Sequence, residues 1–123
     1  MAVIDAVFQT QNIELKQGDD NEIIFAIVDA AGDDVDLSTG CTAKLQARVN
    51  QTDTAAVLSV TEATGLTLGD GTIKFVSNAT ASALLTFSQA TYELEIKKTS
   101  GGLVKTVRRG TITLHKNYAK AGT

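Results

Sequence analysis

The residues best suited to bind a metal ion are four aspartates that surround a glycine. Asp29, Asp33, Asp34 and Asp36 lie close together around Gly32, and carboxylate oxygens are ligands that Ca²⁺ prefers. Their spacing does not match the twelve-residue calcium loop, which also ends in a bidentate glutamate. Aspartate is common in hairpin turns because its side chain accepts hydrogen bonds from nearby backbone N–H groups. We therefore expect an acidic turn here and no metal site.

The other reactive side chains are too few to form a catalytic centre. The chain has one cysteine, Cys41, and one histidine, His115, which excludes an internal disulfide framework and the usual zinc sites. Cys41 begins a segment on its apolar side, where a free cysteine is usually a small buried hydrophobe. His115 is expected on a solvated face. Because no phosphate-binding loop and no Ser–His–Asp set can be assembled either, we expect no enzymatic activity and no cofactor.

A short basic cluster is the remaining candidate for binding. Lys105, Arg108 and Arg109 could meet a phosphate or an acidic partner, although a solvated bulge is the alternative. The net charge of −3 argues against nucleic-acid binding, which requires an electropositive face. Residues 1–40 carry nine acidic residues against one basic residue, and residues 41–123 carry five against ten. These halves form either solvated faces or patches of opposite sign that orient one subunit on a neighbour.

The composition and the length favour one β-rich domain. Thr, Val and Ile, which are β-branched and favour strands, make up 35 of the 123 residues. Turn residues recur at regular short intervals, as expected for an all-β sandwich or barrel. Apolar and polar residues alternate in several segments, which predicts strands with one buried and one solvated face. These segments are Cys41–Val49, Tyr92–Lys97 and Thr111–His115.

Local signals predict three further features. Asp70-Gly71 predicts a tight hairpin between two apolar segments. Ser77 or Asn78 could cap the only predicted helical segment, a short turn near residues 79–85. The alternation slips around 108–110, which predicts a β-bulge whose glycine adopts the required dihedral angles.

Two parts of the chain are apolar without an evident place in a core. The segment Glu22–Asp29 has a second apolar row, Ile24, Ala26 and Val28, which is covered either by the N-terminal segment or by another chain. We expect an N-terminal arm over residues 1–10, a domain over 11–115 and a C-terminal tail over 116–123. The arm would dock on the sheet of a neighbouring chain by strand addition. The predicted partner-binding residues are Val3, Ile4, Val7, Phe8, Ile24, Val28, Arg108 and Arg109.

The sequence also gives expectations about location. The first ten residues contain no basic residue and no long apolar core, so we expect no secretory signal. No apolar run approaches the roughly 20 residues that span a bilayer, so we expect no membrane partner. The protein is expected to be made in a reducing cytoplasm and used there or assembled there into something larger.

The order of motifs resembles a known family. The motifs are Lys16–Asp19, Val35–Arg48, Gly65–Ile73, Thr91–Ile96 and Gly110–Leu114. Together they resemble the small immunoglobulin-like domain at the N-terminus of tailed-phage baseplate upper proteins and related tail-fibre proteins. That family commonly has proline before the Val-Asp-Leu turn and before the Tyr strand, whereas this chain contains no proline.

The resemblance implies both a fold and a function. The expected fold is an immunoglobulin-like antiparallel β-sandwich of about 7–8 strands. The expected function is that of a non-enzymatic virion structural protein, a tail baseplate or tail-fibre adaptor that contacts other virion proteins and copies of itself. The host bacterial cytoplasm would be its place of assembly. A capsid decoration protein of the phage head is one alternative, and a carbohydrate- or ligand-binding module is a second.

Overall fold

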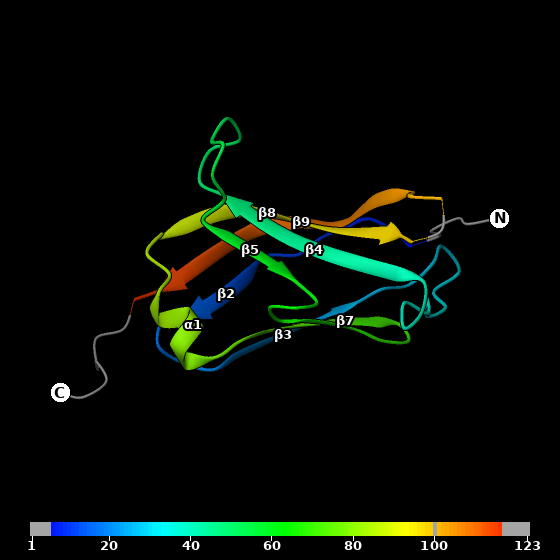
Figure 1. The fold of residues 1–123 in the computed structure, drawn as a ribbon, viewed down its shortest axis with the longest axis horizontal. Helices are drawn as coiled ribbons and strands as arrows, with labels where there is room; N and C mark the ends of the chain where they lie inside the picture. Colours follow the sequence, from blue (N-terminus) through cyan, green and yellow to red (C-terminus); the bar gives the residue numbers. More distant parts are fainter. Residues whose placement is uncertain (1–5, 100, 117–123) are drawn as a thin grey trace.

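Two packed β-sheets and one short helix make up the fold (Figure 1). The structure is a computed structural model that describes residues 6–99 and 101–116. In chain order the elements are β1 (Gln9–Thr10), β2 (Ile13–Lys16), β3 (Asn21–Ala26), β4 (Cys41–Arg48), β5 (Leu58–Thr61), β6 (Leu66–Leu68), β7 (Thr72–Ser77), α1 (Ala79–Ala83), β8 (Gln89–Lys98) and β9 (Val104–His115). The predicted β-sandwich with one helical turn is confirmed. No helix in this described part is long and apolar enough to cross a membrane.

The larger sheet departs from the purely antiparallel arrangement that was expected. It has six strands in the order β1-β9-β8-β4-β5, with β2 also paired to β9, and the smaller sheet has the order β3-β7-β6. Both β1 and β2 run parallel to β9. They lie one after the other along the long strand β9, which explains why the strands outnumber the predicted seven or eight.

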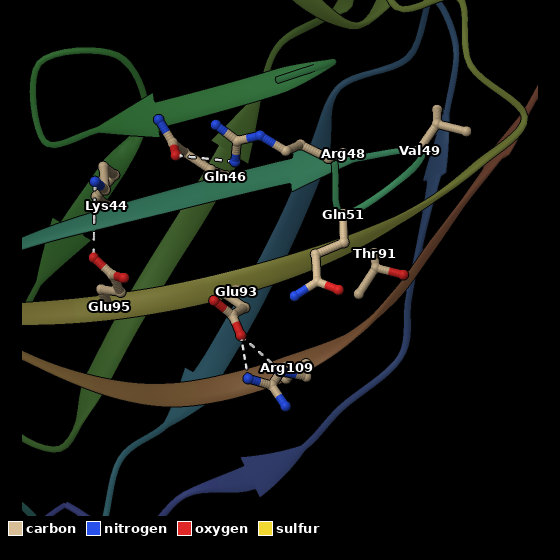
Figure 2. A pocket seen from close by; sticks show the side chains of 9 residues that line it. All are labelled: Lys44, Gln46, Arg48, Val49, Gln51, Thr91, Glu93, Glu95 and Arg109. Carbon is tan, nitrogen blue, oxygen red and sulfur yellow. Dashed lines mark hydrogen bonds and ion pairs between the residues drawn. The ribbon is translucent and has the colours of Figure 1, made fainter. Parts of the chain in front are cut away.

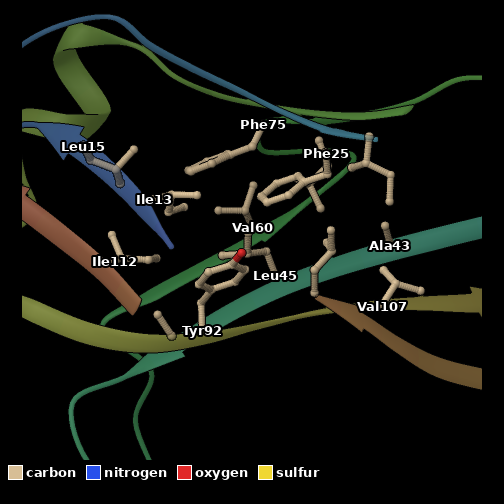
Figure 3. Packing of buried hydrophobic residues seen from close by; sticks show 14 of the residues in the cluster. Ile13, Leu15, Phe25, Ala43, Leu45, Val60, Phe75, Tyr92, Val107 and Ile112 are labelled. Atoms are coloured by element: carbon tan, nitrogen blue, oxygen red, sulfur yellow. The ribbon is translucent and has the colours of Figure 1, made fainter. Parts of the chain in front are cut away.

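The core lies between the two sheets and contains the predicted inner faces (Figure 3). Three side chains of β8 are fully buried, namely Tyr92, Leu94 and Ile96. Phe25 of β3 is also fully buried, and Phe75 of β7 is 1% exposed. The rings of Phe25 and Tyr92 lie 6.1 Å apart, so an aromatic contact joins the sheets. The predicted alternation therefore correctly identifies β4, β8 and the end of β9.

Two of the local predictions are also confirmed. β6 and β7 form the hairpin around Asp70-Gly71, and Gly71 has a φ of 81°, which favours glycine. Asn78 caps α1, because its Oδ1 accepts a hydrogen bond from the backbone N–H of Ala81 at 2.8 Å.

The β-bulge lies slightly before the predicted position, and Gly110 is required for a different reason than the predicted one. Leu94 pairs with Arg108 and the next residue, Glu95, pairs with Thr106, so Val107 is the extra residue. Gly110 has no positive φ. A Cβ atom at this position would instead collide with the backbone carbonyl of Gln11. The glycine is required because the chain passes close by, not because of its dihedral angles.

The N-terminal segment is part of the domain from Ala6 onward. Ala6 is fully buried, and the Val7 N–H donates to the carbonyl of Val28 at 2.8 Å. The Gln11 N–H donates to the carbonyl of Arg109 at 3.0 Å. The described residues of the predicted arm, 6–10, therefore lie against this chain's own domain. Residues 1–5 and 117–123 lie outside the described residues.

Candidate interaction surface

The eight predicted partner-binding residues do not lie together in the structure. Val3 and Ile4 lie outside the described residues. Phe8 and Arg109 lie together, with the guanidinium 5.7 Å from the centre of the ring. Ile24 is half exposed on the smaller sheet. The two sites belong to different sheets, so these residues do not form one continuous patch.

Val7 and Val28 are both half-buried, and the Val7 N–H donates to the Val28 carbonyl, so the N-terminal segment runs beside this end of the second apolar row. The N-terminal segment covers this row at Val28. It does not reach Ile24, where the side chain is 49% exposed. At Ile24 the surface is open, and contact with another chain there stays a prediction.

Arg108 points into the domain, contrary to its expected place in a surface cluster. Its side chain is 2% exposed, because the bulge at Val107 turns both residues inward. The guanidinium donates to the carbonyls of Val107 and Ala26 and to the side chain of Gln11. Among the described residues no carboxylate pairs with it, and burial lowers the pKa of Arg108. Its role is internal: it ties β9 to the smaller sheet.

Tyr92 completes this internal network. Its hydroxyl donates to the backbone carbonyl of Gln11 at 2.5 Å, and burial raises the pKa of Tyr92 to about 12, with the charge of Arg108 opposing the shift. Together, Tyr92 and Arg108 hold the link between β1 and β2. The sequence pattern placed Tyr92 in the core but gave no signal for its polar partner, which lies 81 residues away.

The outer face of the larger sheet is a charged and shallow surface (Figure 2). Lys44 and Glu95 lie 3.7 Å apart, and Arg109 pairs with Glu93. A depression of about 510 Å³ lies over these side chains. Lys44 and Arg109 are thus paired with carboxylates of β8 across neighbouring strands, whereas Arg48 donates to Gln46 and to the Asp53 carbonyl.

The predicted acidic turn is confirmed by its hydrogen bonds. Asp29 Oδ1 accepts from the backbone N–H groups of Ala31 and Asp33 at 2.9 and 3.0 Å. Ser38 donates from its hydroxyl and its backbone to Asp36, which lowers the pKa of that carboxyl. The described residues contain no group of three or more His, Cys, Asp or Glu that could hold a metal ion.

The two reactive side chains have ordinary surroundings. Cys41 is a half-buried free cysteine at the start of β4. His115 is exposed, as predicted, and its Nε2 lies 2.6 Å from Glu14 Oε1. This partner comes from the parallel strand β2, and no local pattern indicates that pairing.

The outer face of the smaller sheet carries two exposed apolar side chains. Ile24 on β3 and Val76 on β7 are 49% and 38% exposed. The register places Ile24 beside Lys74 and Val76 beside Glu22. Three exposed side chains of β3 point to this face, namely Glu22, Ile24 and Ala26.

Comparison with known proteins gives a structural likeness only. No protein-family model matches the sequence, and no curated protein matches it. The fold is similar to that of the N-terminal domain of phage TP901-1 ORF48, with a TM-score of 0.51. The match covers 89% of this chain and 98% of that domain at 18% sequence identity. At this level of identity, the likeness shows a shared fold.

Proposed function

We propose that this chain is a non-enzymatic structural protein of a phage particle, which acts as an adaptor at the tail baseplate or at the attachment of the tail fibres. The observation that carries the proposal is the likeness to the phage ORF48 domain, which is matched over nearly its whole length. The family resemblance of the sequence motifs points to the same setting.

The surfaces of the domain support a function through contacts between proteins. The hollow on the larger sheet is lined by two ion pairs and by Arg48. The apolar face around Ile24 and Val76 is suited instead to burial against a partner. The exposed Phe8 beside Arg109 offers a second, separate contact point.

The test is peptide mass spectrometry on purified particles, with heads and tails separated before digestion. The adaptor proposal predicts that the protein is enriched in the tail fraction at low copy number. Enrichment in the head fraction at high copy number would replace it with capsid decoration. Absence from both fractions would refute a role in the virion.

A further inference from the structure

The strand β3 lies at an edge of the smaller sheet. It has six residues, which makes it the longest edge strand in the described structure, and it pairs only with β7. Edge strands are usually short or blocked because their unpaired N–H and C=O groups attract other strands. A long edge strand is therefore a candidate site for strand addition.

The register shows which backbone groups of β3 are open. The Ile27 N–H, just after β3, donates to the carbonyl of Gly71 on the β7 side. Backbone groups of successive residues point to alternate sides of a strand, so those of Glu22, Ile24 and Ala26 point away from β7. The Ala26 carbonyl accepts from Arg108, in agreement with this direction. No described strand pairs with Glu22 or Ile24 on that side, which leaves two N–H and two C=O groups.

On the comparable edges of the larger sheet, local contacts close the backbone groups of one residue each. On β5, the Thr61 N–H donates to Thr64 Oγ1 at 2.8 Å, and the Thr61 carbonyl accepts from Thr64 and Gly65. On β2, the side chain of Asn21 bonds both the N–H and the carbonyl of Lys16 at 2.8 and 3.0 Å. Such closure is absent from the described contacts of Glu22 and Ile24.

The open edge borders the apolar outer face. An added strand would place one of its side chains beside Ile24, which is 49% exposed, and so extend the face formed with Val76. Backbone hydrogen bonds would then be combined with burial of apolar area, as in known cases of strand addition.

The charge at both ends of β3 decides between possible occupants. Asp19 and Asp20 precede the strand, and Asp29, Asp33 and Asp34 follow it. Antiparallel pairing of β3 with a second copy of itself would bring the acidic start of one strand near the acidic end of the other, which is unfavourable. A strand with basic residues at its ends is complementary in either direction.

We propose that the open edge of β3 binds an extended basic segment of a partner protein by strand addition. The partner segment bonds to the backbone of Glu22 and Ile24, places an apolar side chain beside Ile24 and sets its basic residues against the acidic turns. This inference rests on the proposed adaptor function and names the edge and the chemistry of its partner.

The test uses a blocked seven-residue peptide with Lys at both ends and alternating Val and Thr between them, added to the full chain. Binding is followed by amide chemical shifts and by hydrogen exchange at 150 mM salt. We expect shifts on β3 and slower exchange of the Glu22 and Ile24 amides, which electrostatic attraction alone would not produce. A peptide with Glu in place of Lys is expected to bind at least tenfold more weakly. The absence of β3 shifts at millimolar peptide would overturn the inference.

Two variants test the edge itself. Ile24→Pro removes an N–H that faces away from β7, a position where an edge strand tolerates proline, and we expect it to abolish binding. Ser59→Pro is the matched control on β5. The Thr61 backbone groups point away from β4, so the Ser59 N–H, two residues earlier, also points away from β4. This variant should leave binding unchanged. Circular dichroism checks that both variants fold. Equal binding by the wild type and a folded Ile24→Pro variant would overturn the inference.

Particles that carry these variants separate this inference from the adaptor function. If wild type and Ser59→Pro are incorporated into tails and Ile24→Pro is not, both proposals are supported. Normal incorporation of Ile24→Pro would refute the role of the β3 edge and leave the adaptor function standing. Absence of the wild type from particles would refute the adaptor function, whatever the peptide result.

Discussion

Replacing Tyr92 with phenylalanine tests how the link between β1 and β2 is held. The Tyr92 side chain is fully buried, and its hydroxyl donates to the Gln11 carbonyl at 2.5 Å. Phenylalanine keeps the ring and its contact with Phe25, so the change removes mainly this hydrogen bond. A hydrogen bond contributes about 1 kcal/mol net, and loss of the donor for a half-buried carbonyl can add a similar amount. We expect the free energy of unfolding to fall by about 1–2 kcal/mol at neutral pH.

The same variant should change the response to alkaline pH. Burial raises the pKa of Tyr92 from 10.0 to about 12, so the unfolded chain loses this proton at a lower pH than the folded one. The stability that comes from Tyr92 is then complete below pH 10 and is lost as the pH rises through 12. Each pH unit in this window corresponds to about 1.4 kcal/mol, which gives a loss of about 2 kcal/mol by pH 12. Tyr92→Phe removes this contribution.

Urea unfolding at pH 7 and at steps between pH 9 and pH 12, followed by circular dichroism, measures both effects. The difference in stability between the wild type and Tyr92→Phe should shrink or reverse as the pH rises. The reasoning fails if the variant is within about 0.3 kcal/mol of the wild type at pH 7. It also fails if the two proteins lose stability in parallel across the alkaline range.

Three further changes test other contacts of the fold. Gly110→Ala should lower the free energy of unfolding by about 3 kcal/mol in urea titrations, because its Cβ would collide with the β1–β2 link. The control Gly101→Ala adds a Cβ that meets no atoms at a position of positive φ, and it should lower the free energy of unfolding by only about 1 kcal/mol. Equal losses of stability in the two variants would contradict this account. Asn78→Ala removes the cap of α1 and should cost about 1 kcal/mol by thermal unfolding, whereas no change would show that the cap contributes nothing. Deletion of residues 1–10 should destabilise the isolated domain, since Ala6 is buried and β1 is paired; an unchanged melting temperature would refute this.

The parts of the fold that depend on neighbouring residues were predictable from the sequence. The inner face of β8 follows from alternation alone, because a strand with one buried face must repeat every two residues. The Asp70-Gly71 hairpin and the Asn78 cap likewise depend on residues only a few positions apart.

The features that depend on distant residues were not predictable. No local pattern indicates that β2 pairs with the last strand, so the contact of His115 with Glu14 was unforeseen. The inward direction of Arg108 depends on which residue of β9 is the extra one, and a shift of one position reverses the face of each side chain. The open edge of β3 was also hidden, because a free edge is defined by which strands fail to pair with it.

The parallel pairing of β2 with β9 determines how the domain carries mechanical tension. Lys16, at the end of β2, lies beside His115, at the end of β9, and the start of β1 lies beside Arg108 further back along the same strand. A force that pulls Ala6 and Lys116 apart therefore acts along the strands. It loads the backbone hydrogen bonds that join β1 and β2 to β9 all at once, in shear. Opening the β8–β9 hairpin from its tip would break bonds one after another. Single-molecule stretching should give a higher unfolding force in the first geometry, and equal forces would contradict this. A domain loaded in this way would resist extension along its own strands.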